Sequence, residues 1–159
     1  CMAGQRWEWD GVAFEVLHPA ADGYAIDGKP NHVSCVLMVE AGGRRMLLTS
    51  DIEAPDEAAL VQRYPGGLKA DVLLMPHHGS KTSSTPDFLQ AVGALQAVIP
   101  VGYSSRFGHP KAEVLARYEA MAANIWRTDR DGAVRVVLGG QAVAISAWRH
   151  ERRRYWFER

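Results

Sequence analysis

Three polar clusters follow apolar segments of this chain, and each carries a carboxylate or an imidazole. Asp51 comes just after the apolar run 46–48, His77 and His78 come just after the run 72–75, and His109 ends the short motif 107–109. Ligands of α/β sheets bind beyond the carboxyl ends of the strands. Imidazole and carboxylate without thiolate suit Zn²⁺, Mn²⁺ or Fe. The pattern therefore predicts part of a metal-hydrolase site at several strand ends.

A hydroxyl-rich loop follows the His pair. Residues 79–84 read Gly-Ser-Lys-Thr-Ser-Ser, and Thr85-Pro86-Asp87 is a good helix start. Gly lets the backbone approach a ligand closely, and hydroxyls with an ammonium suit phosphate oxygens. Ser80, Lys81 and Thr82 are therefore candidate phosphate contacts, and a solvated Ser/Thr loop is the alternative.

Each chemical group also has an ordinary structural interpretation. Asp51 could cap a helix or lie in a loop, the two adjacent imidazoles could make plain hydrogen bonds, and His109 could cap a helix or lie on the surface. A two-metal site needs about four ligands per ion once water is counted. Since His18 and His32 stand alone upstream, the inventory amounts to about half a site.

Composition places the chain among soluble globular proteins. It has 159 residues, 47% of them apolar and 23% charged, and its 18 basic residues balance its 18 acidic ones. Any polyanion site must then be a local patch. No apolar run approaches the roughly 20 residues that span a bilayer, and no signal peptide is visible. Of the two cysteines, Cys35 is expected to be a small buried hydrophobe, with no disulfide framework. Because the first residue is Cys1, we expect an excised segment of a larger protein.

Apolar runs and turn residues predict strands that alternate with helices in the middle of the chain and hairpins that flank it. The expected strands are 7–9, 12–17, 34–40, 45–49, 71–75, 97–101, 124–128, 133–138 and 142–148. Helices should begin at Pro55, near Thr85 and at Pro110, and 129–132 should form a turn. This is an α/β pattern with a mixed sheet and no internal linker. We expect one domain over 1–148 and a basic aromatic tail over 149–159.

The expected tail carries five Arg against two Glu, interleaved with aromatic residues. That composition suits single-stranded DNA, whose bases stack while guanidinium groups pair with phosphate. A solvated terminus and contact with anionic lipid are the alternatives.

Five motifs together resemble the metallo-β-lactamase-like domain at the C-terminus of ComEC-type competence proteins, the inner-membrane channels that import single-stranded DNA. The motifs span 31–37, 47–53, 68–84, 107–110 and 127–132, and the His-His-Gly-Ser-Lys-Thr-Ser-Ser run is the most specific of them.

The resemblance implies an αββα sandwich with a di-metal centre at one edge and a nuclease-like role, proposed to degrade the strand that is not imported. It implies that Asp51 bridges the metals, that His77 or His78 is a later ligand, and that His109 binds metal or phosphate. Metal candidates are thus Asp51, His77, His78 and His109, and Asp51, His78 and His109 are the catalytic candidates. Asn31 in the first motif joins the phosphate- or DNA-binding candidates. The expected cofactor is Mn²⁺ or Zn²⁺.

Two departures from the family pattern limit these expectations. Ser50 stands where the family usually has Gly, and the upstream His-x-His-x-Asp-His motif does not occur in this chain. We therefore expect the C-terminal part of a catalytic domain that neither cleaves DNA nor holds two metals tightly by itself.

Three functions stay open from the sequence. The first is a fragment of a metal-dependent phosphodiesterase acting on DNA, in a channel protein of the inner membrane, with the rest of that protein and other competence proteins as partners. The second is an inactive domain that binds DNA or serves as a scaffold in the same channel. The third is a metal hydrolase for a small ester or lactam.

Overall fold

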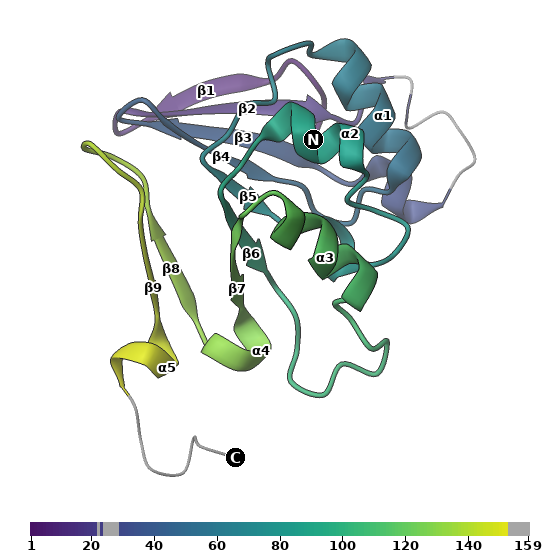
Figure 1. Cartoon of the computed structure of the whole chain (residues 1–159). Coiled ribbons are helices and arrows are strands. Elements are labelled where there is room, and N and C mark those ends of the chain that lie inside the picture. The colour runs from purple at the N-terminus through teal and green to yellow at the C-terminus, as the bar shows by residue number, and fades with distance from the viewer. Residues whose placement is uncertain (22, 24–28, 153–159) are drawn as a thin grey trace.

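A seven-stranded mixed sheet forms the centre of the chain in a computed structural model, which describes residues 1–21, 23 and 29–152 (Figure 1). Its strands lie side by side in chain order. They are β1 (Arg6–Trp9), β2 (Val12–His18), β3 (Val36–Ala41), β4 (Arg44–Leu48), β5 (Val72–Leu74), β6 (Gln96–Ile99) and β7 (Asn124–Arg127). The hairpins expected from Asp10-Gly11 and Ala41-Gly42-Gly43 are both present. The mixed α/β fold expected from the sequence is confirmed.

Strand direction decides where the loops gather. β1 to β4 pair antiparallel, whereas β4, β5, β6 and β7 pair parallel. The loops that follow β4, β5 and β6 therefore leave the same edge of the sheet, which is the edge where ligands of such sheets bind.

Helices α1, α2 and α3 cover one face of the sheet (Figure 1). The helical elements are η2 (Pro30–Val33), α1 (Ala54–Arg63), η3 (Pro76–Gly79), α2 (Pro86–Val92), α3 (Ala112–Ala120), α4 (Thr128–Asp131) and α5 (Trp148–Glu151). Pro55 and Pro86 lie in the first turns of α1 and α2, where a missing N–H costs nothing, and Gly93 ends α2 in a left-handed conformation.

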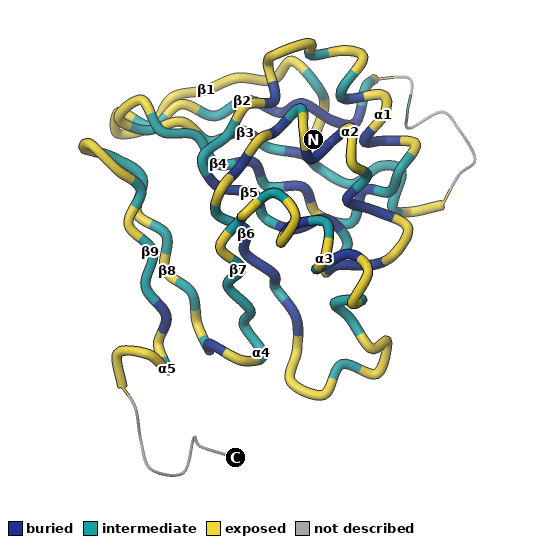
Figure 2. Tube along the Cα trace, viewed as in Figure 1, coloured by how far each residue is buried: buried dark blue, intermediate teal, exposed yellow. Residues whose placement is uncertain are grey.

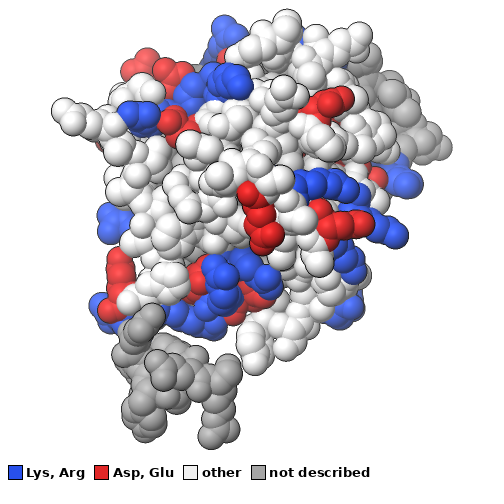
Figure 3. Space-filling model, in the orientation of Figure 1, with Lys and Arg blue, Asp and Glu red and all other residues white. Residues whose placement is uncertain are grey.

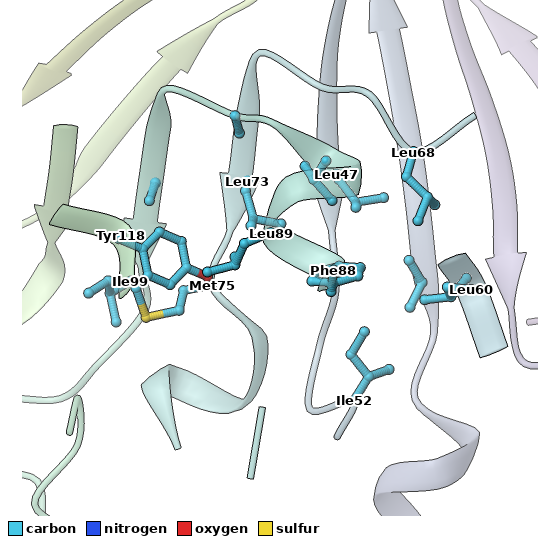
Figure 4. Close-up of a cluster of buried hydrophobic side chains, with 14 of the residues drawn as sticks. Leu47, Ile52, Leu60, Leu68, Leu73, Met75, Phe88, Leu89, Ile99 and Tyr118 are labelled. Atoms are coloured by element: carbon cyan, nitrogen blue, oxygen red, sulfur yellow. The ribbon is translucent and has the colours of Figure 1, made fainter. Parts of the chain in front are cut away.

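The main core lies between this sheet face and the helices (Figure 4). Leu47, Leu73 and Ala97 are neighbours in register across β4, β5 and β6, and each is essentially buried. Phe88 and Tyr118 close the core from α2 and α3. Burying side chains of this size contributes about 1.5–3 kcal/mol each relative to exposure, so the core fixes the strand ends rigidly.

A separate hairpin follows the central sheet. β8 (Val134–Val137) and β9 (Ala144–Ala147) pair antiparallel around Gly139-Gly140, as expected. The turn of this hairpin reaches the β3–β4 turn, because a Cβ on Gly42 would lie 2.9 Å from the Cα of Gly139, and Arg44 donates to the carbonyl of Gln141. Most of the hairpin is exposed or half-buried (Figure 2).

The expectation for Cys35 is wrong, because Cys1 and Cys35 form a disulfide with their Cα atoms 5.9 Å apart. The N-terminal segment makes this pairing possible. Ala3 and Gly4 donate to the carbonyls of Pro19 and Val16 at the end of β2, which lies beside the start of β3. Proximity of this kind arises from tertiary pairing, which cysteine spacing does not reveal.

Three smaller differences concern helices. The expected turn at 129–132 is a helical turn, α4, which begins at Thr128. The helix expected from Pro110 begins at Ala112 instead. The first residues of the expected tail belong to α5, and residues 153–159 lie outside the described part of the chain. Within the described residues, no helix has both the length and the apolar character needed to cross a membrane.

Candidate metal and phosphate site

The loop after β5 has an unusual backbone. His77 and His78 both have left-handed conformations, with φ of 46° and 54°, and Gly79 follows with φ of 81°. A non-Gly residue in this region costs about 1–2 kcal/mol, and such residues concentrate at functional sites. The backbone N–H of His77 donates to the carbonyl of Ser50, another left-handed residue, at 3.0 Å. This hydrogen bond joins the loop after β4 to the loop after β5. Both loops have strained backbone next to the candidate side chains.

His78 and Asp51 form the first pair of the site. The Nε2 of His78 lies 3.3 Å from a carboxylate oxygen of Asp51, and both side chains are partly exposed. The Nδ1 of the same ring lies 2.5 Å from the carbonyl of Pro100, an oxygen that can only accept, so Nδ1 carries the proton. In the neutral ring Nε2 then directs a lone pair toward a carboxylate oxygen. Two acceptors this close need a proton or a cation between them, and a backbone carbonyl that accepts from Nδ1 is typical of metal-binding His.

His77 and Glu53 form the second pair. The Nδ1 of His77 lies 3.4 Å from a carboxylate oxygen of Glu53, and Asn31 donates its side-chain amide to the same oxygen at 3.3 Å. The hydroxyl of Thr82 lies 3.4 Å from Nδ1 of His77. Asn31, Thr82 and His77 therefore lie together, as members of one site would.

Glu53 was not among the site residues expected from the sequence. It begins α1, and the carboxylate of Asp56 accepts its backbone N–H at 3.0 Å, so its role could pass for helix capping alone. The only sequence signal is its position two residues after Asp51, at the end of the same strand.

His109 approaches the pairs from the loop after β6. Its ring lies 6.1 Å from the ring of His77 between centroids, and it precedes Pro110 through a cis peptide bond. Burial lowers the pKa of His109, and the charges of Lys111, His77 and His78 lower it further, so the neutral ring is favoured. Its Nδ1 is buried with no hydrogen-bond partner among the described residues. An orphaned buried nitrogen of this kind fits a ring that faces an additional ligand.

The hydroxyl loop, residues 79–84, meets the same site where Thr82 approaches His77, but its members differ in exposure. Ser80 is buried, and its hydroxyl lies 3.0 Å from that of Thr82. Lys81 and Thr82 are exposed. Thr82 and Lys81 can therefore reach a ligand directly, whereas Ser80 holds Thr82 in place.

A buried carboxylate fixes the far end of this loop. Glu57 on α1 is fully buried and accepts the backbone N–H groups of Ser84 and Thr85, at 2.5 and 2.8 Å. Arg117 on α3 donates to the carbonyls of Ser83 and Ser84 from the other side. Burial raises the pKa of Glu57, and the hydrogen bonds from Thr85 and Ser84 oppose that rise. Sequence reasoning missed Glu57, since an acid in a first helical turn normally faces water.

The two isolated upstream imidazoles have structural partners. His32 pairs with Asp56 at 3.0 Å, and Nε2 of His18 lies 2.9 Å from the carbonyl of His32. These contacts hold η2 against the start of α1, where Asn31 meets Glu53.

The side chains of the candidate site have the right chemistry to bind a divalent metal, but they are few in number. Imidazole nitrogens and carboxylate oxygens are suitable ligands for Zn²⁺ or Mn²⁺. Among the residues that the structure describes, however, no three or more His, Cys, Asp or Glu side chains form a group that could hold an ion. The candidate site presents two acid–imidazole pairs, His78–Asp51 and His77–Glu53, and the orphaned imidazole of His109.

Comparison with known proteins gives related sequences over most of the chain. It is 44% identical over 137 residues to competence protein ComA of Neisseria gonorrhoeae, which covers 86% of this chain and 19% of that protein. It is 36% identical over 123 residues to ComE operon protein 3 of Bacillus subtilis, which covers 77% of this chain and 15% of that protein. Recombination protein 2 of Haemophilus influenzae is 34% identical over 136 residues, covering 86% of this chain and 16% of that protein. The chain thus spans about a fifth or less of the length of these relatives.

The fold has a solved counterpart in a metal-dependent hydrolase from Parabacteroides distasonis, with a TM-score of 0.51, 12% identity, and coverage of 80% of this chain and 56% of that one. No family model matches the chain. The identities to the competence proteins, together with this fold, agree with the resemblance carried by the five motifs. We conclude that the chain belongs to the ComEC-type competence-protein family, as a metallo-β-lactamase-like segment.

Proposed function

We propose that this chain is the part of a metal-dependent phosphodiesterase that binds the phosphate and supplies some of the metal ligands, within a DNA-uptake protein. The observation that supports this most directly is the His78–Asp51 pair. The carbonyl of Pro100 accepts from Nδ1 of the ring, and this contact leaves Nε2 facing the carboxylate. Loops from β4, β5 and β6 all contribute to this position.

In this proposal Asp51, His77, His78 and His109 hold the metal, with Glu53 as an added candidate. A bound Mn²⁺ or Zn²⁺ would supply an activated water and polarise the phosphoryl oxygens. Thr82, Lys81 and Asn31 bind and orient the phosphodiester through hydrogen bonds and charge. Burial and the neighbouring charges lower the pKa of His109, which favours the neutral ring that a metal requires.

The biological role proposed here is degradation of the strand that does not enter the cell. The names of the relatives link them to competence. The proposed partners are DNA, the remainder of a longer membrane-channel protein and other competence proteins. The proposed organisation is a hydrolase-like unit over 1–148 followed by a basic tail over 149–159.

A second candidate is a domain of the same channel that binds DNA or acts as a scaffold without catalysis. This role would need only the phosphate contacts from Asn31, Lys81 and Thr82, of which Lys81 and Thr82 are exposed.

A nuclease assay separates the two candidates. The assay uses a longer protein that contains this chain and the upstream His-x-His-x-Asp-His region, with Mn²⁺ and Zn²⁺ titrated in turn. We expect metal-dependent DNA cleavage that Asp51→Ala abolishes and that Asp87→Ala, a change to an exposed acid at the start of α2, leaves intact. A folded, metal-loaded protein that does not cleave DNA would refute the phosphodiesterase proposal.

A further inference from the structure

The loop between β6 and α3 exposes aromatic side chains beside the candidate site. Tyr103 is 82% exposed and Phe107 is 61% exposed. Most of this loop is exposed in Figure 2, where it extends away from the sheet. Large rings exposed at such levels bury no core surface, so their type calls for another explanation.

The planar groups of this loop contact one another in series toward the site. The guanidinium of Arg106 lies 4.8 Å from the centre of the Phe107 ring. The Phe107 ring in turn lies 6.0 Å from the ring of His109, with only 21° between their planes, and His109 is 6.1 Å from His77. A flat ligand held at Arg106 or Phe107 would thus lie next to the candidate metal-binding imidazoles, and Tyr103 adds a second exposed ring to the same loop.

The loop is also held firmly against the phosphate-binding segment. Lys111 donates its backbone N–H to the carbonyl of Gly79 at 2.9 Å, and a Cβ on Gly79 would lie only 2.6 Å from the Cβ of Pro110. The ammonium of Lys111 folds back onto the carbonyl of Phe107 at 2.8 Å. These contacts fix the base of the loop relative to Thr82 and Lys81.

The positive charge of residues 101–112 indicates which kind of ligand the loop would bind. Residues 101–112 contain Arg106 and Lys111 and no Asp or Glu. The face of the molecule in Figure 3 otherwise mixes blue and red groups, so a segment free of acids differs from its surroundings. Exposed rings with neighbouring cations are the combination that binds unpaired nucleotides, through base stacking and phosphate pairing.

We propose that Tyr103, Arg106 and Phe107 form a platform that stacks a base of single-stranded DNA and so places the adjacent phosphodiester at the candidate site. This inference rests on the proposed function and adds its substrate form: an unpaired strand recognised by its bases. Stacking accepts every base, so the platform gives little sequence preference.

The test is the binding of a fluorescent oligothymidylate of about 12 nucleotides, a length suited to single-strand sites, to the 159-residue chain. Fluorescence anisotropy is recorded at low salt with a chelator, so that cleavage plays no part. An abasic strand of equal length is the matched ligand. Trp9→Ala is the matched variant, since Trp9 is 76% exposed at the far end of β1.

We expect the double variant Tyr103→Ala/Phe107→Ala to bind oligothymidylate at least about tenfold more weakly, because both rings that could stack a base are removed. Its binding of the abasic strand and the binding by Trp9→Ala should stay as in the unmodified chain. Arg106→Gln should weaken the binding of both strands and lower the salt dependence by about one phosphate contact.

Equal binding of oligothymidylate by the double variant and the unmodified chain would overturn the proposal, as would equal losses for both strands. If the loop instead joins two copies of the chain, the double variant would change the sedimentation behaviour and leave oligothymidylate binding unaltered, which also overturns it. Metal-dependent cleavage of the abasic strand by the longer protein distinguishes this failure from that of the proposed function. That strand has phosphodiesters but no base to stack, so its cleavage should depend on Asp51 and not on Tyr103 or Phe107.

Discussion

The central sheet has loops at both ends of its strands, called here the hairpin edge and the site edge. Both sets of loops need left-handed backbone, but different residue types supply it. At the edge of the hairpin turns, left-handed backbone is assigned mainly to glycines, among them Gly11, Gly42 and Gly43. At the opposite edge, where β4 and β5 end, Gly79 is left-handed too, but four other left-handed positions are taken by Ser50, His77, His78 and Ser84. Glycine adopts this conformation freely, whereas other residues incur about 1–2 kcal/mol. The site edge therefore carries more strained non-Gly residues than the hairpin edge, where Asp10 also adopts this conformation, and two of them, His77 and His78, are candidate ligands.

The largest difference between the two edges should appear at their glycines. Gly79 combines φ of +81° with a Cβ position 2.6 Å from the Cβ of Pro110, so Gly79→Ala should destabilise the chain by about 4 kcal/mol. Gly43 has φ of +74° and nothing within 4 Å, and Gly43→Ala should cost about 1 kcal/mol. Urea unfolding of both variants measures the difference. Equal losses would mean that packing against Pro110 does not constrain the site edge.

The second test removes the clamp on the hydroxyl loop. Glu57→Ala leaves the buried amides of Ser84 and Thr85 without an acceptor, which should cost about 2–3 kcal/mol after the relief of burying the carboxylate. Asp87→Ala, which changes an exposed acid, should destabilise the chain by only a few tenths of about 1 kcal/mol. Chemical denaturation compares the two variants. A loss from Glu57→Ala as small as that from Asp87→Ala would show that the loop holds its shape without Glu57.

A third test uses the end of β7, which lies at the site edge. There the carboxylate is paired with an arginine. Arg127 donates to both carboxylate oxygens of Asp129, at 3.1 and 2.7 Å, and this hydrogen bonding lowers the pKa of Asp129. A lowered carboxyl pKa stabilises the folded chain above the ordinary Asp value, and that contribution is lost as the pH falls through the lowered pKa. Asp129→Asn should therefore cost about 1 kcal/mol near pH 7 and progressively less in acid.

The pH dependence is read from thermal unfolding at several pH values, with Asp87→Asn as the control. A loss from Asp129→Asn that stays constant into strong acid would contradict the assignment of the lowered pKa to this pair.

The smallest expected effect has the opposite sign. His77→Gly should relieve backbone strain and stabilise the chain by about 0.5–1 kcal/mol, after the greater freedom of glycine in the unfolded chain is subtracted. It should also weaken the binding of Mn²⁺ or Zn²⁺, measured by calorimetry. Asp10→Gly in the first hairpin, where φ is 53°, should give a similar stabilisation with no effect on metal binding. Destabilisation by His77→Gly would show that the ring contributes more through its contacts than its backbone conformation costs.

Local patterns in the sequence predicted the positions of the strands along the chain and most turns. Asp10-Gly11 and Gly139-Gly140 each mark a hairpin, and apolar runs before Asp51 and His77 mark strand ends. Such signals act between near neighbours in the chain, so they can be read without a structure. That Asp51 and His78 approach each other follows from the parallel pairing of β4 with β5.

Features that depend on distant segments were not predictable in this way. Glu57 is an ordinary acid in a first helical turn until α2 packs against it and supplies two amides. The Cys1–Cys35 bond depends on the N-terminal segment lying along β2. The exposure of Tyr103 is likewise invisible in the sequence, because an aromatic residue after an apolar strand is more often buried.

The side-by-side arrangement of β1 to β7 in chain order also bears on how the protein reaches this structure. Every strand of the sheet pairs with the one that precedes or follows it in the sequence, so most sheet contacts join nearby segments. Contacts of short sequence separation close small loops and favour rapid folding. The sheet can grow strand by strand as the chain emerges from the ribosome. The candidate site, whose residues lie between Asn31 and His109, can assemble before the C-terminal hairpin is synthesised.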